Sequence, residues 1–179
     1  GGWLRYIELR RHTMRMKPGQ NLSQAGVELA RRVGATTGPF ARVITSTVPR
    51  AYETAVAMGF AVDEQFEELA ALNDSVEAEV RWDAGFAIWG EAAQRGGATS
   101  RFVQRQAQFL QAVAAALPLG GAALVVSHGG IVEAQAVGCL PEADHMAWGG
   151  ACSWCEGVRL SFDGDKFVDA KILRVGDGE

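Results

Sequence analysis

Residues 122–130 of this 179-residue chain read AALVVSHGG, and this stretch decides the fold. The run from Ala123 to Ser127 is apolar without alternation, which is typical of a central strand that is covered on both faces. The tripeptide HGG follows directly, and a helical stretch over residues 131–137 comes next. A buried strand that passes at once into a helix predicts an α/β protein with a largely parallel sheet.

The alternation of strand and helix continues before that stretch. We expect further strands at Leu4–Leu9 and Arg42–Thr45, and helices at Ser23–Arg32, Pro49–Met58 and Val103–Leu117. Ser23 is suited to capping a helix, and Pro49 is suited to the first turn of one. Thr99 or Ser100 is the expected N-cap of the longest helix, whereas segment 82–97, with its glycines and tryptophans, predicts irregular or broken helix.

A β-hairpin is expected near the C-terminal end of the sequence. The runs Val158–Phe162 and Phe167–Leu173 flank the turn sequence Asp163-Gly164-Asp165, which is a strong hairpin signal. We therefore expect a three-layer α/β/α sandwich whose central sheet is mostly parallel and carries a C-terminal antiparallel hairpin. No repeat and no linker interrupts the sequence, so residues 1–179 are expected to form a single domain.

The composition argues against several classes of protein. The chain has 17 Lys and Arg residues against 21 Asp and Glu residues, and its net charge of -4 argues against a general nucleic-acid binder. It has no run of about 20 apolar residues, so we expect no membrane-spanning helix. Its three cysteines, two of them in a lone C-x-x-C at 152–155, fit core or edge positions better than a disulfide framework or a metal site. No signal peptide is recognisable, so a cytoplasmic location is expected.

Three polar clusters stand just after the ends of predicted strands. They are Arg11-His12-Thr13-Met14-Arg15, Ser46-Thr47-Val48-Pro49-Arg50 and Ser127-His128-Gly129-Gly130. Ligands of open α/β sheets bind at the carboxyl ends of the strands, so we expect these clusters to form one site. Two of the three histidines in the chain fall in them.

The residue types in these clusters indicate an anion with several oxygens. Arg11, Arg15 and Arg50 bring guanidinium groups to one edge of an otherwise acidic protein, and such groups match phosphate geometry. Gly129 and Gly130 allow close approach of the backbone, with amides that open a helix toward the anion. Phosphate is therefore the expected ligand.

Taken together, these motifs resemble those of the histidine phosphatase superfamily, which has the phosphoglycerate-mutase-like fold. The resemblance rests on Arg11-His12 after the first strand, Leu22-Ser23-x-x-Gly26, Ser46-x-x-x-Arg50-Ala51-x-x-Thr54-Ala55 and Val126-Ser127-His128-Gly129-Gly130. It covers nearly the whole chain, and the set of motifs is specific although the Arg-His pair alone is not.

The resemblance implies a phosphomonoester hydrolase that works through a phosphohistidine on His12. Arg11, Arg50 and His128 would then clamp the phosphoryl oxygens, where charge builds up in the transition state. The further substrate-binding positions are Arg15, Thr13 and Gly129. Because positioning and charge stabilisation do most of the work in phosphoryl transfer, neither a metal nor a cofactor is expected.

The proton donor to the leaving oxygen is expected to be a carboxylic acid. The family often places it after the second motif in an L-x-E-like segment, and Leu72-Asn73-Asp74 fits that spacing, so Asp74 is the favoured residue. Glu68 and Glu67 are the alternatives. The family has Arg-His-Gly where this chain has Thr13 after His12, and a Thr hydroxyl at that position could donate to phosphate.

Two other functions remain open at this point. One is a cofactor-dependent phosphoglycerate-type mutase, and the other is a non-catalytic phosphate-binding module. The short segment between Arg15 and Leu22 lacks the insertion that resembles the substrate-holding region of those mutases, which favours the phosphatase branch. The expected substrate is a phosphorylated small molecule or a phosphoprotein, and the sequence predicts no oligomeric state.

Segments 76–97 and 142–150 are expected to cover the pocket, because substrate selectivity in such a site comes from what lies over it. Their aromatic side chains, Trp82, Phe86, Trp89 and Trp148, either pack against the substrate or bury themselves in a cap. The sequence leaves both alternatives open.

Overall fold

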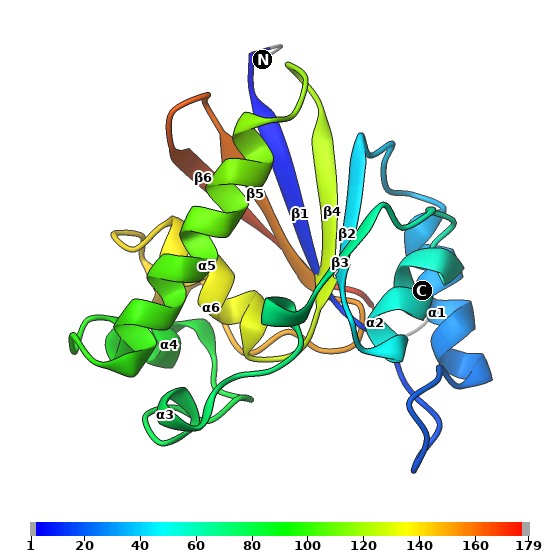
Figure 1. Cartoon of the computed structure of the whole chain (residues 1–179), viewed down its shortest axis with the longest axis horizontal. Coiled ribbons are helices and arrows are strands. Elements are labelled where there is room, and N and C mark those ends of the chain that lie inside the picture. Colours follow the sequence, from blue (N-terminus) through cyan, green and yellow to red (C-terminus); the bar gives the residue numbers. More distant parts are fainter. Residues whose placement is uncertain (1–2, 177–179) are drawn as a thin grey trace.

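Six strands form one sheet in the order β3-β2-β4-β1-β5-β6 in a computed structural model that describes residues 3–176 (Figure 1). The strands are β1 (Arg5–Arg11), β2 (Arg42–Ser46), β3 (Glu64–Phe66), β4 (Ala122–Ser127), β5 (Gly157–Phe162) and β6 (Phe167–Leu173). β1, β2, β3 and β4 run parallel to one another. β5 runs antiparallel to β1, and β6 runs antiparallel to β5. The sheet is thus mostly parallel with an antiparallel C-terminal hairpin, as predicted.

Helices cover both faces of this sheet. They are α1 (Gln24–Gly34), α2 (Pro49–Ala57), α3 (Asp74–Glu77), α4 (Phe86–Ala93), α5 (Ala98–Ala115) and α6 (Ile131–Cys139), with two short 3₁₀ turns, η1 (Glu67–Leu69) and η2 (His145–Trp148). Figure 1 shows α1 and α2 on one side of the strands and α4, α5 and α6 on the other. The predicted three-layer arrangement is therefore confirmed. No helix within residues 3–176 has the length and apolar character needed to cross a membrane.

The position of β4 between two helical layers explains why its sequence is apolar without alternation. Ala123 and Val125 pack into the core beneath α4, α5 and α6, whereas Leu124 and Val126 pack into the core beneath α1 and α2. All six residues of β4 are buried. Because successive side chains of a strand point to opposite faces, a strand between two helical layers needs apolar residues at every position.

Two helix starts agree with the sequence prediction and one does not. The hydroxyl of Ser23 accepts the Gly26 N–H at the start of α1, and Pro49 is the first residue of α2. The longest helix, α5, begins at Ala98 without a side-chain cap from its own N-cap residue. The carboxylate of Glu79 accepts the first two N–H groups of α5 instead, so neither Thr99 nor Ser100 is the N-cap.

Other local predictions need smaller corrections. β1 extends two residues beyond the predicted end at Leu9, because its pairing with β4 continues through Arg11 opposite Ser127. Segment 82–97, predicted as irregular or broken helix, contains the regular helix α4. The C-x-x-C segment is a loop before β5, and Cys152 and Cys155 are both buried in it, which agrees with core positions.

A buried charge cluster lies along β1. Glu8 is only 4% exposed, and its carboxylate pairs with the Arg10 Nε atom at 2.9 Å and with the Arg159 Nη1 atom at 3.2 Å. Arg10 is equally buried and also donates to the Cys155 carbonyl oxygen. Removal of one partner from such a pair leaves an uncompensated charge in the core, which costs far more than the intact pair contributes.

We therefore expect Glu8→Gln to lower the free energy of unfolding by about 3 kcal/mol or more, because Arg10 loses its counter-charge. The matched control is Glu64→Gln, which removes the partner of Arg42 in a solvent-exposed pair between β2 and β3. That change should cost under about 1 kcal/mol. Chemical denaturation of both variants measures the difference, and equal losses would show that the Glu8 pair is not a buried constraint on β1.

Candidate active site

The carboxyl ends of three parallel strands bring the two predicted histidines together. His12 directly follows β1, and its backbone N–H donates to the Ser127 carbonyl oxygen at 3.0 Å. His128 directly follows β4, and its Nε2 atom lies 2.7 Å from the hydroxyl of Ser46, the last residue of β2. The two imidazole centroids are 5.2 Å apart. The three polar clusters of the sequence thus meet at one edge, as predicted.

Both ring nitrogens of His12 are hydrogen-bonded, and their partners show which of them carries the proton. Its Nδ1 atom lies 2.7 Å from the Thr13 carbonyl oxygen. Because a carbonyl oxygen only accepts, Nδ1 carries the ring proton and Nε2 keeps its lone pair. The Nε atom of Arg50 donates to that lone pair at 3.1 Å. His12 is therefore a neutral imidazole with its proton on Nδ1 and its lone pair on Nε2.

Both histidines are held in the neutral form. Burial lowers the pKa of His12 to about 4, and the nearby positive charge of Arg50, Arg11 and Arg15 acts in the same direction, against the hydrogen bond to Thr13. Burial likewise lowers the pKa of His128 to about 3, with help from His12 and two of these arginines. At neutral pH the site therefore has two neutral imidazole rings among permanently charged cations.

These side chains line a cavity of about 280 Å³. The lining residues are Arg11, His12, Arg15, Lys17, Arg50, Trp82, His128, Gly129 and Trp154. Four of them are cationic and none is acidic. A small concave site with this charge favours an anion with several oxygens, because each guanidinium group can donate two parallel hydrogen bonds to it.

Arg11 is held rigidly between two tryptophans. Its guanidinium carbon lies 4.1 Å from the ring centroid of Trp154 and 5.4 Å from that of Trp82. Its Nη1 atom donates to the Cys152 carbonyl oxygen at 3.0 Å, whereas its buried Nε atom has no hydrogen-bond partner within residues 3–176. Cation–π stacking and one anchored N–H thus fix the group and leave other donors free for a ligand.

Gly129 is required by the close approach of Trp82. A Cβ atom at position 129 would lie 2.8 Å from the Trp82 ring, a distance that real Cβ atoms do not reach. The tryptophan can therefore cover the loop after β4 only because that loop has no side chain at this point. Trp82 is half exposed and forms one wall of the cavity.

The other aromatic residues of the predicted cover lie elsewhere. Phe86 and Trp89 are completely buried, and Phe86 packs edge-on against Trp148 at 5.4 Å between centroids. None of these three lines the cavity. Of the four aromatic side chains singled out in the sequence, only Trp82 faces the site, and the other three pack in the hydrophobic core under α4, α5 and α6.

Some predicted site residues are not brought to the cavity. Thr13 is fully buried, and its hydroxyl faces α1, where a Cβ at Gly26 would lie 2.9 Å from it. Asp74 is the exposed first residue of α3. Glu67 and Glu68 are also exposed, and the Glu67 carboxylate accepts a hydrogen bond of 2.8 Å from Thr47, which follows β2. None of these residues is part of the cavity lining.

Two residues that line the cavity, Lys17 and Trp154, were not predicted from the sequence. Lys17 stands in the loop after β1, where no local pattern marks it as a site residue. Trp154 lies inside the C-x-x-C segment, and only its contact with Arg11, which is distant in the sequence, brings it to the site. The Lys17 ammonium group adds to the cationic lining, and the Trp154 ring centroid is 5.7 Å from that of His12.

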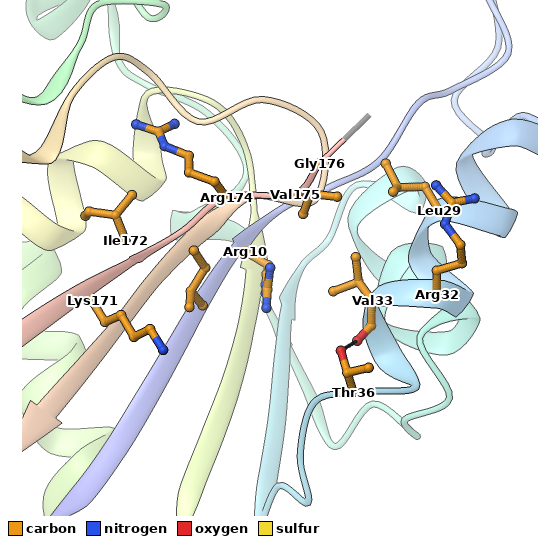
Figure 2. A pocket seen from close by; sticks show the side chains of 11 residues that line it. Arg10, Leu29, Arg32, Val33, Thr36, Lys171, Ile172, Arg174, Val175 and Gly176 are labelled. Carbon is orange, nitrogen blue, oxygen red and sulfur yellow. Dashed lines mark hydrogen bonds between the residues drawn. The ribbon is translucent and has the colours of Figure 1, made fainter. Parts of the chain in front are cut away.

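A second, larger cavity of about 400 Å³ does not have this chemistry (Figure 2). It lies between α1 and β6, and its cationic lining residues are Arg10, Arg32, Lys171 and Arg174. Two of these are already engaged, because Arg10 pairs with Glu8 and Arg174 pairs with Glu156. No histidine lines this cavity, so it offers no nucleophile comparable to His12. Within residues 3–176, no three His, Cys, Asp or Glu side chains gather in a way that could hold a metal ion.

Comparison with known families gives one match along most of the chain. The family model described as histidine phosphatase superfamily (branch 1) matches residues 8–172. No curated protein matches the chain.

Solved structures with the same fold include phosphatases and a mutase. A phosphoserine phosphatase from Entamoeba histolytica in complex with 3-phosphoglyceric acid has a TM-score of 0.70 at 15% identity, with 96% of this chain and 98% of that chain covered. A mycobacterial glucosyl-3-phosphoglycerate phosphatase has a TM-score of 0.63 at 19% identity, with coverage of 96% and 98%. A phosphoglycerate mutase from Bacillus anthracis str. Sterne has a TM-score of 0.65 at 16% identity, with coverage of 97% and 93%.

The lowered pKa values of the two histidines lead to a test by NMR. Imidazole ¹⁵N or ¹³C shifts should show His12 and His128 neutral from pH 8 down to pH 5, with protonation beginning only as the pH approaches about 4 for His12 and about 3 for His128. Inorganic phosphate should raise both pKa values, because a bound anion offsets the arginine charge. A titration of either ring near the ordinary value of about 6.5 in the free protein would contradict the burial and charge assigned to them.

Proposed function

The chain belongs to the histidine phosphatase superfamily (branch 1), and we propose that it hydrolyses phosphomonoesters through a phosphohistidine on His12. The observation that supports this most strongly is the state of the His12 ring. Its Nε2 lone pair stands at the wall of a cationic cavity while its Nδ1 proton is bound by the Thr13 carbonyl oxygen. A neutral imidazole so oriented is a nucleophile that needs no base to activate it.

In the first step the Arg50 Nε–H group transfers its hydrogen bond from the Nε2 atom of His12 to a phosphoryl oxygen. The freed Nε2 lone pair attacks phosphorus, and the bond from phosphorus to the ester oxygen breaks. The ring becomes positively charged, and the Thr13 carbonyl stabilises that charge through Nδ1. Arg11, Arg50 and the other cationic side chains face the equatorial oxygens, whose charge rises in the transition state. The departing oxygen takes a proton from an acid and leaves as an alcohol.

In the second step a water molecule attacks the phosphohistidine on the opposite side of phosphorus. The bond between phosphorus and Nε2 breaks, the water gives its proton to the conjugate base of the acid used in the first step, and inorganic phosphate leaves with His12 again neutral. His128 belongs to the clamp, because its Nε2 atom is tied to the Ser46 hydroxyl and its Nδ1 atom has no partner within residues 3–176. Since the cationic side chains supply the positive charge, no metal takes part in either step.

The acid that protonates the leaving oxygen remains a proposal among three carboxylates. Asp74 is the residue favoured by its spacing, although it stands outside the cavity at the start of α3. Glu67 is hydrogen-bonded to Thr47, one residue after the Ser46 that contacts His128. Glu68 follows it in η1. All three lie in the elements that directly follow β3 in the chain, η1 and α3.

The cavity favours a small phosphorylated substrate. Its volume of about 280 Å³ is at the lower end for ligand sites. Arg15 and Lys17 add positive charge beyond the Arg11 and Arg50 pair, which suits a substrate with more than one anionic group. A mutase or a phosphate-binding module would use the same clamp. A mutase forms a new phosphoester, a binding module forms no product, and a hydrolase releases inorganic phosphate.

His12→Ala should lower the turnover of p-nitrophenyl phosphate by at least about 10³-fold, because the nucleophile is lost. Weak binding of inorganic phosphate should remain. The matched control is His145→Ala, since His145 is also buried but is bonded to the Leu140 carbonyl oxygen outside the cavity. Phosphate release is measured for the wild type and both variants. The same assay with an added chelator measures whether turnover requires a metal. Full turnover in His12→Ala would remove phospho-His12 from the mechanism, and transfer to an acceptor without phosphate release would identify a mutase.

The acid can be identified from its dependence on the leaving group. Asp74→Asn, Glu68→Gln and Glu67→Gln are compared on p-nitrophenyl phosphate, whose leaving oxygen needs no proton, and on an alkyl phosphate, whose leaving oxygen does. The variant of the true acid should lose about 10²–10⁴-fold on the alkyl ester and little on the aryl ester. Equal losses on both esters would mean that none of the three carboxylates protonates the leaving oxygen.

A further inference from the structure

Glu133 is a buried carboxylate that the proposed reaction does not use. It lies in the first turn of α6, which is buried along nearly its whole length, and the residue is 0% exposed. Burial raises the pKa of this carboxyl group above its ordinary value. A carboxylate is costly at such a position unless its oxygens are hydrogen-bonded, so its partners show what it holds in place.

The two oxygens of Glu133 reach two different loops. One accepts the backbone N–H of Gly130 at 2.8 Å, in the loop that carries His128 and Gly129 into the cavity. The other accepts the backbone N–H of Cys152 at 2.7 Å. The carboxylate therefore bridges the loop after β4 and the loop before β5, which are far apart in the sequence.

The second loop in turn holds Arg11. The Cys152 carbonyl oxygen accepts Arg11 Nη1 at 3.0 Å, and Trp154, two residues later, stacks on the same guanidinium group. The chain of contacts thus runs from the loop of His128 through Glu133 and the Cys152 peptide to Arg11. Both ends of this chain are parts of the phosphate clamp.

Capping of α6 alone does not account for this arrangement. A cap of the helix requires only the bond to Gly130, and glutamine could make that bond equally well. Both partners of Glu133 are N–H donors, so only a group that accepts at both oxygens satisfies them. The amide of glutamine would place an NH₂ group against one of the two N–H groups.

We infer that Glu133 is a positioning residue that sets the spacing between His128 and Arg11 for phosphoryl transfer. It does not touch the substrate. Its charge also lies behind the cationic cavity, where it is the strongest of the negative charges acting on Arg11. The kinetic part of this inference rests on the proposed function, whereas the spacing of the clamp does not.

The test compares Glu133→Gln with a control that has the same hydrogen-bonding pattern. Glu79 also accepts two backbone N–H groups, from Ala98 and Thr99 at the start of α5, and it does not line the cavity. Glu79→Gln therefore loses a comparable cap without disturbing the clamp. The readouts are the kcat and KM of p-nitrophenyl phosphate, and the Kd values of inorganic phosphate and of orthovanadate, measured well below the thermal midpoint of each variant.

Glu133→Gln should lower kcat and weaken orthovanadate by about 10–100-fold each, because small displacements of a clamp penalise the transition-state geometry that vanadate mimics. Inorganic phosphate should weaken by no more than about threefold, and KM should change as little. Glu79→Gln should keep wild-type values for all four quantities, and only its thermal midpoint should fall. Wild-type kcat and vanadate affinity in Glu133→Gln would overturn the inference, and Glu133 would then only cap the N-terminus of α6.

A second variant covers the case in which Glu133→Gln does not fold. Glu133→Asp keeps the charge, but its shorter side chain reaches only one of the two loops, so it should weaken vanadate more than phosphate. Wild-type vanadate affinity in that variant would equally overturn the inference. If the wild type binds phosphate and vanadate but shows no turnover, the proposed function fails while the vanadate comparison still tests Glu133.

Discussion

The parallel register between β1 and β4 is the constraint on which the rest of the site depends. Arg11 lies opposite Ser127 in this pairing, so His12 and His128 leave their strands side by side with their ring centroids 5.2 Å apart. A slip of one residue would turn every side chain of β1 to the other face of the sheet. The alternation within β1 opposes such a slip, because Ile7 and Leu9 point into the apolar core whereas Glu8 and Arg10 pair on the other face.

Electrostatics then explains how permanent cations and neutral imidazoles coexist. Burial makes protonation of His12 and His128 costly, and the positive charge of the nearby arginines adds to that cost. The same positive charge favours a bound anion. The Glu133 carboxylate behind the cavity and the tryptophans around Arg11 hold this cationic group in one arrangement.

Much of the fold and the centre of the site could be predicted from the sequence, because their signals are local. The apolar run of β4, the cap at Ser23 and the Asp163-Gly164-Asp165 turn each act within a few residues. The polar clusters at the strand ends placed His12 and His128 together through a general property of parallel sheets.

The remaining features depend on contacts between distant segments, which no local pattern shows. Glu79 caps α5 from a preceding segment, and Glu133 joins two loops that the chain order separates. The Thr13 hydroxyl lies against α1, which approaches it closely at Gly26. The choice among Asp74, Glu68 and Glu67 as the acid stays a prediction for the same reason, since all three are exposed.

Transfer of the phosphoryl group to the Nε2 atom of His12 is tested most directly by trapping the intermediate. The protein is mixed with a phosphate-labelled aryl ester for milliseconds and quenched in alkali, where phosphohistidine survives, and its peptides are sequenced by mass spectrometry. We expect the label on the peptide that contains His12, at a level that falls as inorganic phosphate is released. Label on another residue, or turnover without any labelled peptide, would contradict the mechanism.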